Sequence, residues 1–135
     1  MELRTLVDSS AWVEYLRRTG SETNVRLRTM LETDAPLATT DVIIMELLCG
    51  ASSVDAKRRI WGLMNRFSML PTRPLFDYEV AAELYTRCRR SGFTPANTND
   101  LLVAAVAIGK KVPLLAADSD FDRIASVSSL RLANG

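Results

Sequence analysis

Short apolar runs alternate along this chain with longer segments in which apolar residues recur every three or four positions. The runs predict buried strands at 5–7, 36–39 and 112–117, and weaker patterns indicate two more at 68–70 and 129–132. The helical periodicity predicts further helices from Ser9 or Ser10 to before Gly20 and near 25–31, 42–51, 60–67, 78–92 and 100–111. Strands that alternate with helices are typical of an α/β fold with a mainly parallel sheet.

Polar residues and glycines mark several of the expected helix ends. Asp77 is expected to cap the helix at 78–92, because an aspartate side chain can accept hydrogen bonds from the free amide groups of a first turn. Gly92 is expected to end that helix, since glycine adopts the left-handed backbone of a helix terminus without strain. Asn97 or Thr98 is expected to cap the last helix.

Length and composition are those of an ordinary globular domain. A chain of 135 residues, 47% hydrophobic and 24% charged, predicts a single domain spanning residues 1–135. No apolar stretch reaches the roughly 18 residues needed to cross a membrane, and residues 1–8 lack the layout of a signal peptide. We therefore expect a cytoplasmic protein that does not bind a membrane. Cys49 and Cys88 have no metal-binding spacing and are interpreted as two buried free thiols.

Histidine is absent from the sequence, and this absence narrows the chemistry. Ser-His-Asp and Cys-His catalysis are excluded, together with every site that needs an imidazole ligand or base. Carboxylates remain, and they bind hard, oxygen-preferring cations such as Mg²⁺ and Mn²⁺. The positions of the aspartates and glutamates therefore carry most of the information about function.

Two aspartates follow directly after predicted strands. Asp8 comes after the run at 5–7, and Asp118 comes after the run at 112–117. Either aspartate alone is more simply interpreted as a turn or helix-cap residue. Both together favour a functional site, because parallel strands place the residues that follow them at one edge of the sheet, where α/β proteins bind ligands.

Two further carboxylates are less well explained by a structural role. Glu46 interrupts the apolar helix at 42–51, so it either lies on that helix's exposed edge or faces a cation. Asp100 lies in the first turn of the last helix, where it would interact favourably with the helix dipole. However, Asn97 and Thr98 already supply cap residues there, so capping does not require Asp100.

Four carboxylates brought close together would repel one another, and some would take up protons. One or two divalent cations would offset the charge, orient a phosphodiester and generate a hydroxide nucleophile. Such a site needs no histidine. Phosphodiester hydrolysis is therefore the chemistry that this set of residues favours.

The segments that contain these residues resemble the PIN-domain ribonucleases, and above all the VapC toxins of VapBC toxin–antitoxin pairs. The matching segments are LVDSSAWVEYL, TTDVIIMELLCGA, NTNDLLVAAVAI and LLAADSDFDRI, in the family's order and over nearly the whole chain. The resemblance implies a three-layer α/β/α sandwich with a short, mainly parallel central sheet. It also implies a Mg²⁺- or Mn²⁺-dependent endoribonuclease. One departure is Ala117, where many relatives carry a polar residue that supports the aspartate after it.

The resemblance also assigns roles to individual residues. The residues that match the family's acidic catalytic quartet are Asp8, Glu46, Asp100 and Asp118. By this resemblance Asp8 and Asp100 would hold the principal metal, and Glu46 would act as co-ligand or base. Asp118 and Asp120 would complete the shell or form a second metal position. Ser10 matches a small hydroxyl residue near the first aspartate.

By the same resemblance we expect an RNA substrate, a homodimer and a VapB-type antitoxin. The antitoxin's C-terminal arm would cross a groove on the first four helices and bring an arginine beside Glu46. The residues expected near this groove are Trp12, Tyr15, Met30, Leu31, Leu48 and Trp61, although the two tryptophans are more simply interpreted as core. Arginines that could contact RNA are Arg17, Arg18, Arg89 and Arg90, although each is more simply interpreted as a solvated surface charge.

Other functions stay open from the sequence alone. The chain could be a housekeeping PIN nuclease in RNA processing, or a PIN scaffold that binds RNA or protein without cutting it. A phosphoryl-transfer or receiver protein would also place aspartates at strand ends. Such proteins usually need a lysine near the site, and the lysines here are confined to Lys57, Lys110 and Lys111.

Overall fold

The computed structural model describes residues 4–133 and contains a four-stranded sheet in which all neighbouring strands are parallel. The strands are β1 (Thr5–Val7), β2 (Leu37–Thr39), β3 (Ser68–Met69) and β4 (Leu114–Leu115). Their order across the sheet is β3-β2-β1-β4, so β1 and β4 are neighbours although they are far apart in the sequence. Every residue of β1, β2 and β4 is buried, as expected for a parallel sheet covered on both faces.

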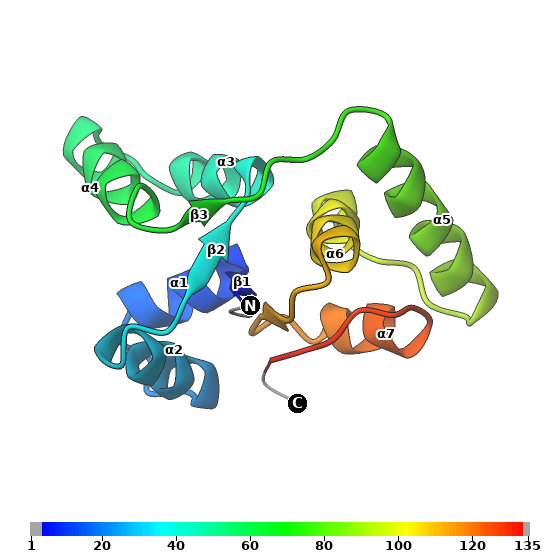
Figure 1. The fold of residues 1–135 in the computed structure, drawn as a ribbon, viewed down its shortest axis with the longest axis horizontal. Helices are drawn as coiled ribbons and strands as arrows, with labels where there is room; N and C mark the ends of the chain where they lie inside the picture. Colours follow the sequence, from blue (N-terminus) through cyan, green and yellow to red (C-terminus); the bar gives the residue numbers. More distant parts are fainter. Residues whose placement is uncertain (1–3, 134–135) are drawn as a thin grey trace.

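Seven helices pack around the sheet within the described residues (Figure 1). They are α1 (Ser9–Leu16), α2 (Glu22–Glu32), α3 (Asp41–Cys49), α4 (Val54–Met64), α5 (Phe76–Arg90), α6 (Thr98–Lys110) and α7 (Asp120–Ser126). Figure 1 shows α1–α4 on the left of the view with β2 and β3, and α5–α7 on the right. The predicted α/β/α fold with a short parallel sheet is confirmed.

The core joins the strands to one apolar face of each neighbouring helix. Leu6, Leu114 and Leu115 of the strands are completely buried, as are Trp12 of α1 and Ile43 of α3. Burial of a large aliphatic side chain contributes about 1.5–3 kcal/mol. The sheet and its covering helices therefore hold the chain segments that follow each strand in defined positions.

The parallel register brings the ends of β1 and β4 together. Leu6 pairs with Leu114 and Val7 with Leu115. The N–H of Asp8 donates a hydrogen bond to the carbonyl oxygen of Leu115 at 2.9 Å. The segments that follow the two strands therefore leave the sheet side by side, as the sequence predicts.

Several expected features differ in the structure. The strand expected at 112–117 is shortened to Leu114–Leu115, and the segment at 129–132 forms only a bridge between Leu132 and Leu114. The sequence pattern did not predict α7, because this short helix buries only two side chains and shows little periodicity. Cys49 is exposed near the end of α3 rather than buried. Within residues 4–133, no helix combines the length and the hydrophobicity needed to cross a membrane.

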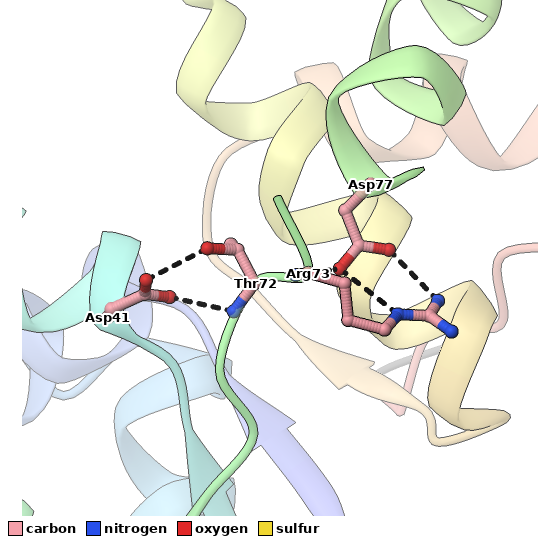
Figure 2. A network of polar contacts seen from close by, with 4 residues as sticks. All are labelled: Asp41, Thr72, Arg73 and Asp77. Atoms are coloured by element: carbon pink, nitrogen blue, oxygen red, sulfur yellow. Dashed lines mark hydrogen bonds and ion pairs between the residues drawn. The ribbon is translucent and has the colours of Figure 1, made fainter. Parts of the chain in front are cut away.

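The expectation that Asp77 caps α5 is wrong. Asp77 lies inside the first turn, after Leu75, whose backbone is left-handed with φ of 63°. Its carboxylate instead binds Arg73, accepting hydrogen bonds from the main-chain N–H at 2.7 Å and from the guanidinium at 2.9 Å (Figure 2). Thr72 donates its N–H and hydroxyl to Asp41 at 3.0 and 2.8 Å. These contacts tie the connection between β3 and α5 to the start of α3.

Candidate metal centre

Asp8 joins the end of β1 to the start of α1. Its Oδ2 caps the helix by accepting hydrogen bonds from the Ser10 N–H at 3.0 Å and hydroxyl at 2.6 Å. Its Oδ1 is buried and has no hydrogen-bond partner among the described residues. The residue is only 2% exposed. Burial raises the pKa of the Asp8 carboxyl, the nearby charge of Asp118 raises it further, and the Ser10 hydrogen bonds oppose the shift.

Ser10 connects Asp8 to the loop that follows β4. Its hydroxyl donates to Asp8 and accepts a hydrogen bond from the N–H of Ala117 at 3.0 Å. This contact fixes the backbone immediately before Asp118. Residue 117 has no polar side chain to support Asp118, but its main-chain N–H holds the loop by donating to Ser10. The hydrogen bond therefore compensates in part for the alanine.

Asp100, Asp118 and Asp120 form a tight group. One carboxylate oxygen from each lies within 4.8 Å of the others, close enough for the three to share a metal ion. Asp100 is in the first turn of α6, and Asp120 is in the first turn of α7. The N–H of Asp120 donates to Asp118 Oδ1 at 2.9 Å, which orients the Asp118 side chain.

The crowding of carboxylates changes the acidity of Asp100. Burial and the charges of Asp8, Asp118, Glu46 and Asp120 raise the pKa of Asp100 to about 7. Near neutral pH this side chain therefore exchanges readily between a protonated form and a form that a cation can bind. Among residues 4–133, none of these carboxylates forms an ion pair with a basic side chain.

Glu46 reaches the same region from α3, which packs against both α1 and α6. Its Oε1 accepts a hydrogen bond from the Ser9 hydroxyl at 3.1 Å. Burial and the charge of Asp8 raise the pKa of Glu46. The side chains of Ser9 and Asn99 both act to lower this pKa. Sequence reasoning did not identify Ser9 and Asn99 as site residues. The one feature that could have indicated them is their position in the sequence, directly next to Asp8 and Asp100.

Four of these carboxylates line one open cleft of about 350 Å³: Asp8, Glu46, Asp100 and Asp118. The residues fit a hard divalent cation, because the charged donors are carboxylate oxygens and the buried Asp8 Oδ1 lacks a partner in the described part of the chain. In one respect the geometry differs from the expected division of ligands. The tight group contains Asp120 and does not contain Asp8.

A second groove, mostly apolar, lies between α3, α4 and β3. It has a volume of about 460 Å³ and is lined by Asp41, Ile44, Met45, Leu48, Cys49, Lys57, Trp61 and Met69. Of the six residues expected near a groove, Leu48 and Trp61 line this one. The side chain of Trp61 is 45% exposed, so the interpretation of Trp61 as a core residue is wrong. Trp12 is completely buried, and the other three expected residues pack against the core rather than line this groove.

Comparisons with known proteins match nearly the whole chain. The family model of the PIN domain matches residues 5–127. Ribonuclease VapC11 of Mycobacterium tuberculosis is 38% identical over 130 residues, which cover 96% of this chain and 97% of that protein.

Solved structures show the same fold at lower identity. VapBC-1 from nontypeable Haemophilus influenzae matches with a TM-score of 0.74 and 19% identity over 96% of both chains. VapBC-5 from Mycobacterium tuberculosis, a member of the VapBC family of toxin–antitoxin systems, matches with a TM-score of 0.65 and 22% identity over 96% of this chain and 97% of that chain. The parallel sheet, the family match over residues 5–127 and the relative at 38% identity agree with one another. This chain therefore belongs to the PIN-domain family and, within it, to the VapC ribonucleases.

Proposed function

We propose that this chain is a Mg²⁺- or Mn²⁺-dependent endoribonuclease and the toxin of a VapBC-type toxin–antitoxin pair, acting in the cytoplasm as a single domain. The observation that carries the proposal is the convergence of four carboxylates on one cleft in a chain 38% identical to ribonuclease VapC11. Carboxylates suffice for this chemistry, because a divalent cation bound among them polarises a phosphodiester and lowers the pKa of a bound water.

The carboxylates have different surroundings, and we assign them different roles. Asp100, Asp118 and Asp120 supply the tight ligand set, and Asp8 adds its unpaired Oδ1. Glu46 stands apart from this group and is oriented by the Ser9 hydroxyl. We therefore assign Glu46 the role of the general base that accepts a proton from the attacking water. Its raised pKa favours this role, because a general base works best with a pKa near the operating pH.

We further propose that a VapB-type antitoxin occupies the apolar groove between α3, α4 and β3. Helix α3 presents Met45 and Leu48 to this groove and Glu46 to the acidic cleft, so a segment bound in the groove would end near the carboxylates. An arginine on such a segment would bind a carboxylate bidentately and compete with the cation.

We also propose that the chain forms a homodimer. Large apolar side chains are exposed around the groove and at the start of α5: Met45, Trp61, Met69, Leu75, Phe76 and Tyr78. The antitoxin would cover the side chains around the groove, Met45, Trp61 and Met69. A second copy of the chain would cover those at the start of α5, Leu75, Phe76 and Tyr78, since exposed apolar patches mark interfaces. Light scattering at micromolar concentration should give twice the mass of one chain, and a monomer would contradict this proposal.

The nuclease assignment is tested with the purified chain and single-stranded or hairpin RNA. Mg²⁺ or Mn²⁺ should support cleavage, EDTA should abolish it, and Asp100→Asn should lower the rate by orders of magnitude. The matched control is Asp122→Asn, an exposed aspartate of α7 outside the tight group, which should keep the wild-type rate. If folded wild-type protein cuts no RNA with either metal, the non-enzymatic scaffold replaces the nuclease.

The toxin assignment is tested in growing bacteria. Expression of the chain alone should stop growth, co-expression of the adjacent upstream gene should restore it, and Asp100→Asn should be harmless. If abundant, folded wild-type protein leaves growth unchanged but cuts RNA in vitro, the housekeeping nuclease replaces the toxin.

A further inference from the structure

A polar pocket lies between α1 and α2, apart from the acidic cleft and the apolar groove. It has a volume of about 500 Å³ and is lined by Tyr15, Leu16, Arg18, Gly20, Asn24 and Arg28. Figure 1 shows the two helices side by side at the lower left of the view. Asp8 caps the amino end of α1, and the pocket lies at its carboxyl end. The two ends of α1 therefore carry opposite charges.

A buried amide holds one wall of this pocket in place. Asn24 is only 4% exposed, and its Nδ2 donates to the main-chain carbonyl oxygen of Glu14 at 2.8 Å. Its Oδ1 accepts a hydrogen bond from the Arg28 guanidinium at 3.4 Å. Because a buried polar side chain needs such partners, Asn24 both fastens α2 to α1 and positions Arg28 beside the pocket.

Two arginines give the pocket a positive charge that carboxylates do not neutralise. Arg18 follows α1, and Arg28 lies on the exposed side of α2. Within residues 4–133, neither guanidinium forms an ion pair. Glu14, the acidic residue of α1, instead accepts a hydrogen bond from the hydroxyl of Thr19 at 3.0 Å. Guanidinium groups bind phosphate bidentately, so the pocket has the chemistry of a phosphate site.

Tyr15 adds an aromatic wall to the two arginines. Its ring stands edge-on to Trp12, with 5.9 Å between the ring centroids, and Trp12 is completely buried. This contact fixes the orientation of the Tyr15 ring. Proteins that bind single-stranded nucleic acids stack the bases on aromatic rings and bind the phosphates with nearby basic groups. The pocket therefore offers groups for both parts of a nucleotide.

We propose that this pocket binds a phosphate group of the RNA strand whose scissile bond lies in the acidic cleft. The proposal rests on the proposed nuclease function. Val13 and Glu14 line the cleft and the next two residues line the pocket, so the two surfaces adjoin along α1. A helix rises about 1.5 Å per residue, so roughly 12 Å separates the two ends of α1, which a short stretch of RNA spans. This continuity favours RNA over an acidic peptide as the occupant.

The test measures binding of a fluorescently labelled oligouridine in EDTA, by anisotropy at several salt concentrations. Each single-strand phosphate that the protein neutralises contributes about 0.7 to the slope of log K against log salt. Because the two arginines share one phosphate, removing both should lower the slope by about 0.7. The variant is Arg18→Gly with Arg28→Gln, because glycine keeps the left-handed backbone of residue 18 (φ 53°) without strain. With Mg²⁺ and cleavable RNA, it should raise KM and leave kcat close to the wild-type value.

The matched control is Arg58→Gln with Arg87→Gln, which removes two exposed arginines that pair with carboxylates on α4 and α5. Equal slopes for wild type and pocket variant, or equal losses in pocket and control variants, overturn the proposal. It is also overturned if the pocket variant binds RNA normally but no longer binds its antitoxin, because the pocket is then a protein site. If the wild type binds RNA through the pocket but never cleaves it, the nuclease function fails and the phosphate site stands.

Discussion

The protonation state of Asp100 affects both metal binding and the stability of the fold. Burial and the charges of four carboxylates raise its pKa to about 7, so its negative charge costs free energy until a cation offsets it. At low metal concentration, activity should therefore fall as the pH drops below neutrality, because protons then compete with the cation for Asp100. Asparagine at this position would keep nearly the same shape and would remove the charge.

At the residue scale, Asp100→Asn should lose nuclease activity and yet gain stability without metal. In EDTA at pH 8, the relieved repulsion should raise the thermal midpoint Tm by at least about 3 °C, corresponding to a free-energy gain near 1 kcal/mol. Differential scanning calorimetry measures this shift, with the exposed Asp122→Asn as control. An unchanged or lowered Tm for Asp100→Asn would show that repulsion in the cleft is weak.

At the scale of elements, α6 is packed near its carboxyl end against the connection between β3 and α5. Gly109 of α6 lies against the Arg73 guanidinium, and a Cβ at this position would overlap that group. Arg73 pairs with Asp77, which is only 1% exposed, and lies over the ring of Phe76 at 4.2 Å from its centroid. The glycine therefore makes room for the cation that compensates a buried carboxylate.

Two glycine-to-alanine substitutions should consequently change stability in opposite directions. Gly109→Ala should lower the free energy of unfolding by about 1 kcal/mol, because it displaces the Arg73 guanidinium from the buried Asp77. The hydrogen bond from the Arg73 main-chain N–H to Asp77 stays, and the gain in helix propensity offsets part of the loss. Gly62→Ala in α4, where a Cβ meets nothing within 4 Å, should raise it by about 0.5–1 kcal/mol through helix propensity. Urea unfolding of both variants decides, and shifts of the same sign would contradict the proposed role of the Arg73 contact.

For the whole molecule, folding, protonation and metal binding are coupled. The pKa values of Asp8, Glu46 and Asp100 are all raised in the folded state, so these three carboxyl groups bind more protons in the folded chain than in the unfolded chain. The stability that these groups contribute is present at pH values below their unfolded pKa and is lost as the pH rises through the folded pKa. For Asp100 this loss falls between about pH 4 and pH 7. A divalent cation that binds the ionised carboxylates reverses the trend.

Saturating Mn²⁺ should therefore raise Tm more at pH 8 than at pH 5. The reason is that ionised carboxylates repel one another at pH 8 and hold the cation, whereas protons compete with it at pH 5. Thermal scans with Mn²⁺ and with EDTA at both pH values measure the difference, and Asp8→Asn with Asp100→Asn should abolish it. A gain in Tm that is equal at both pH values would place metal binding outside the cleft.

Sequence and structure each account for a different part of this picture. By itself, the sequence determined the α/β class, the approximate positions of all four strands and six of the helices, and the placement of Asp8 and Asp118 after strands. The helix expected near 60–67 is α4, which begins earlier, at Val54, and ends at Met64. These features depend on periodicity and on residues that are adjacent in the chain. The short α7 escaped this reasoning, because too few residues carry its pattern, and the strand expected at 129–132 forms only a bridge at Leu132.

Only the tertiary structure decided which side chains share a surface. Asp77 has the local sequence of a helix cap, yet it binds Arg73, and Trp61 has the chemistry of a core residue, yet it lines an exposed groove. Ser9 meets Glu46 across 37 positions of sequence. Burial and hydrogen bonding depend on how the elements pack, and these partners come within reach only after the sheet has fixed α1 and α3 relative to each other.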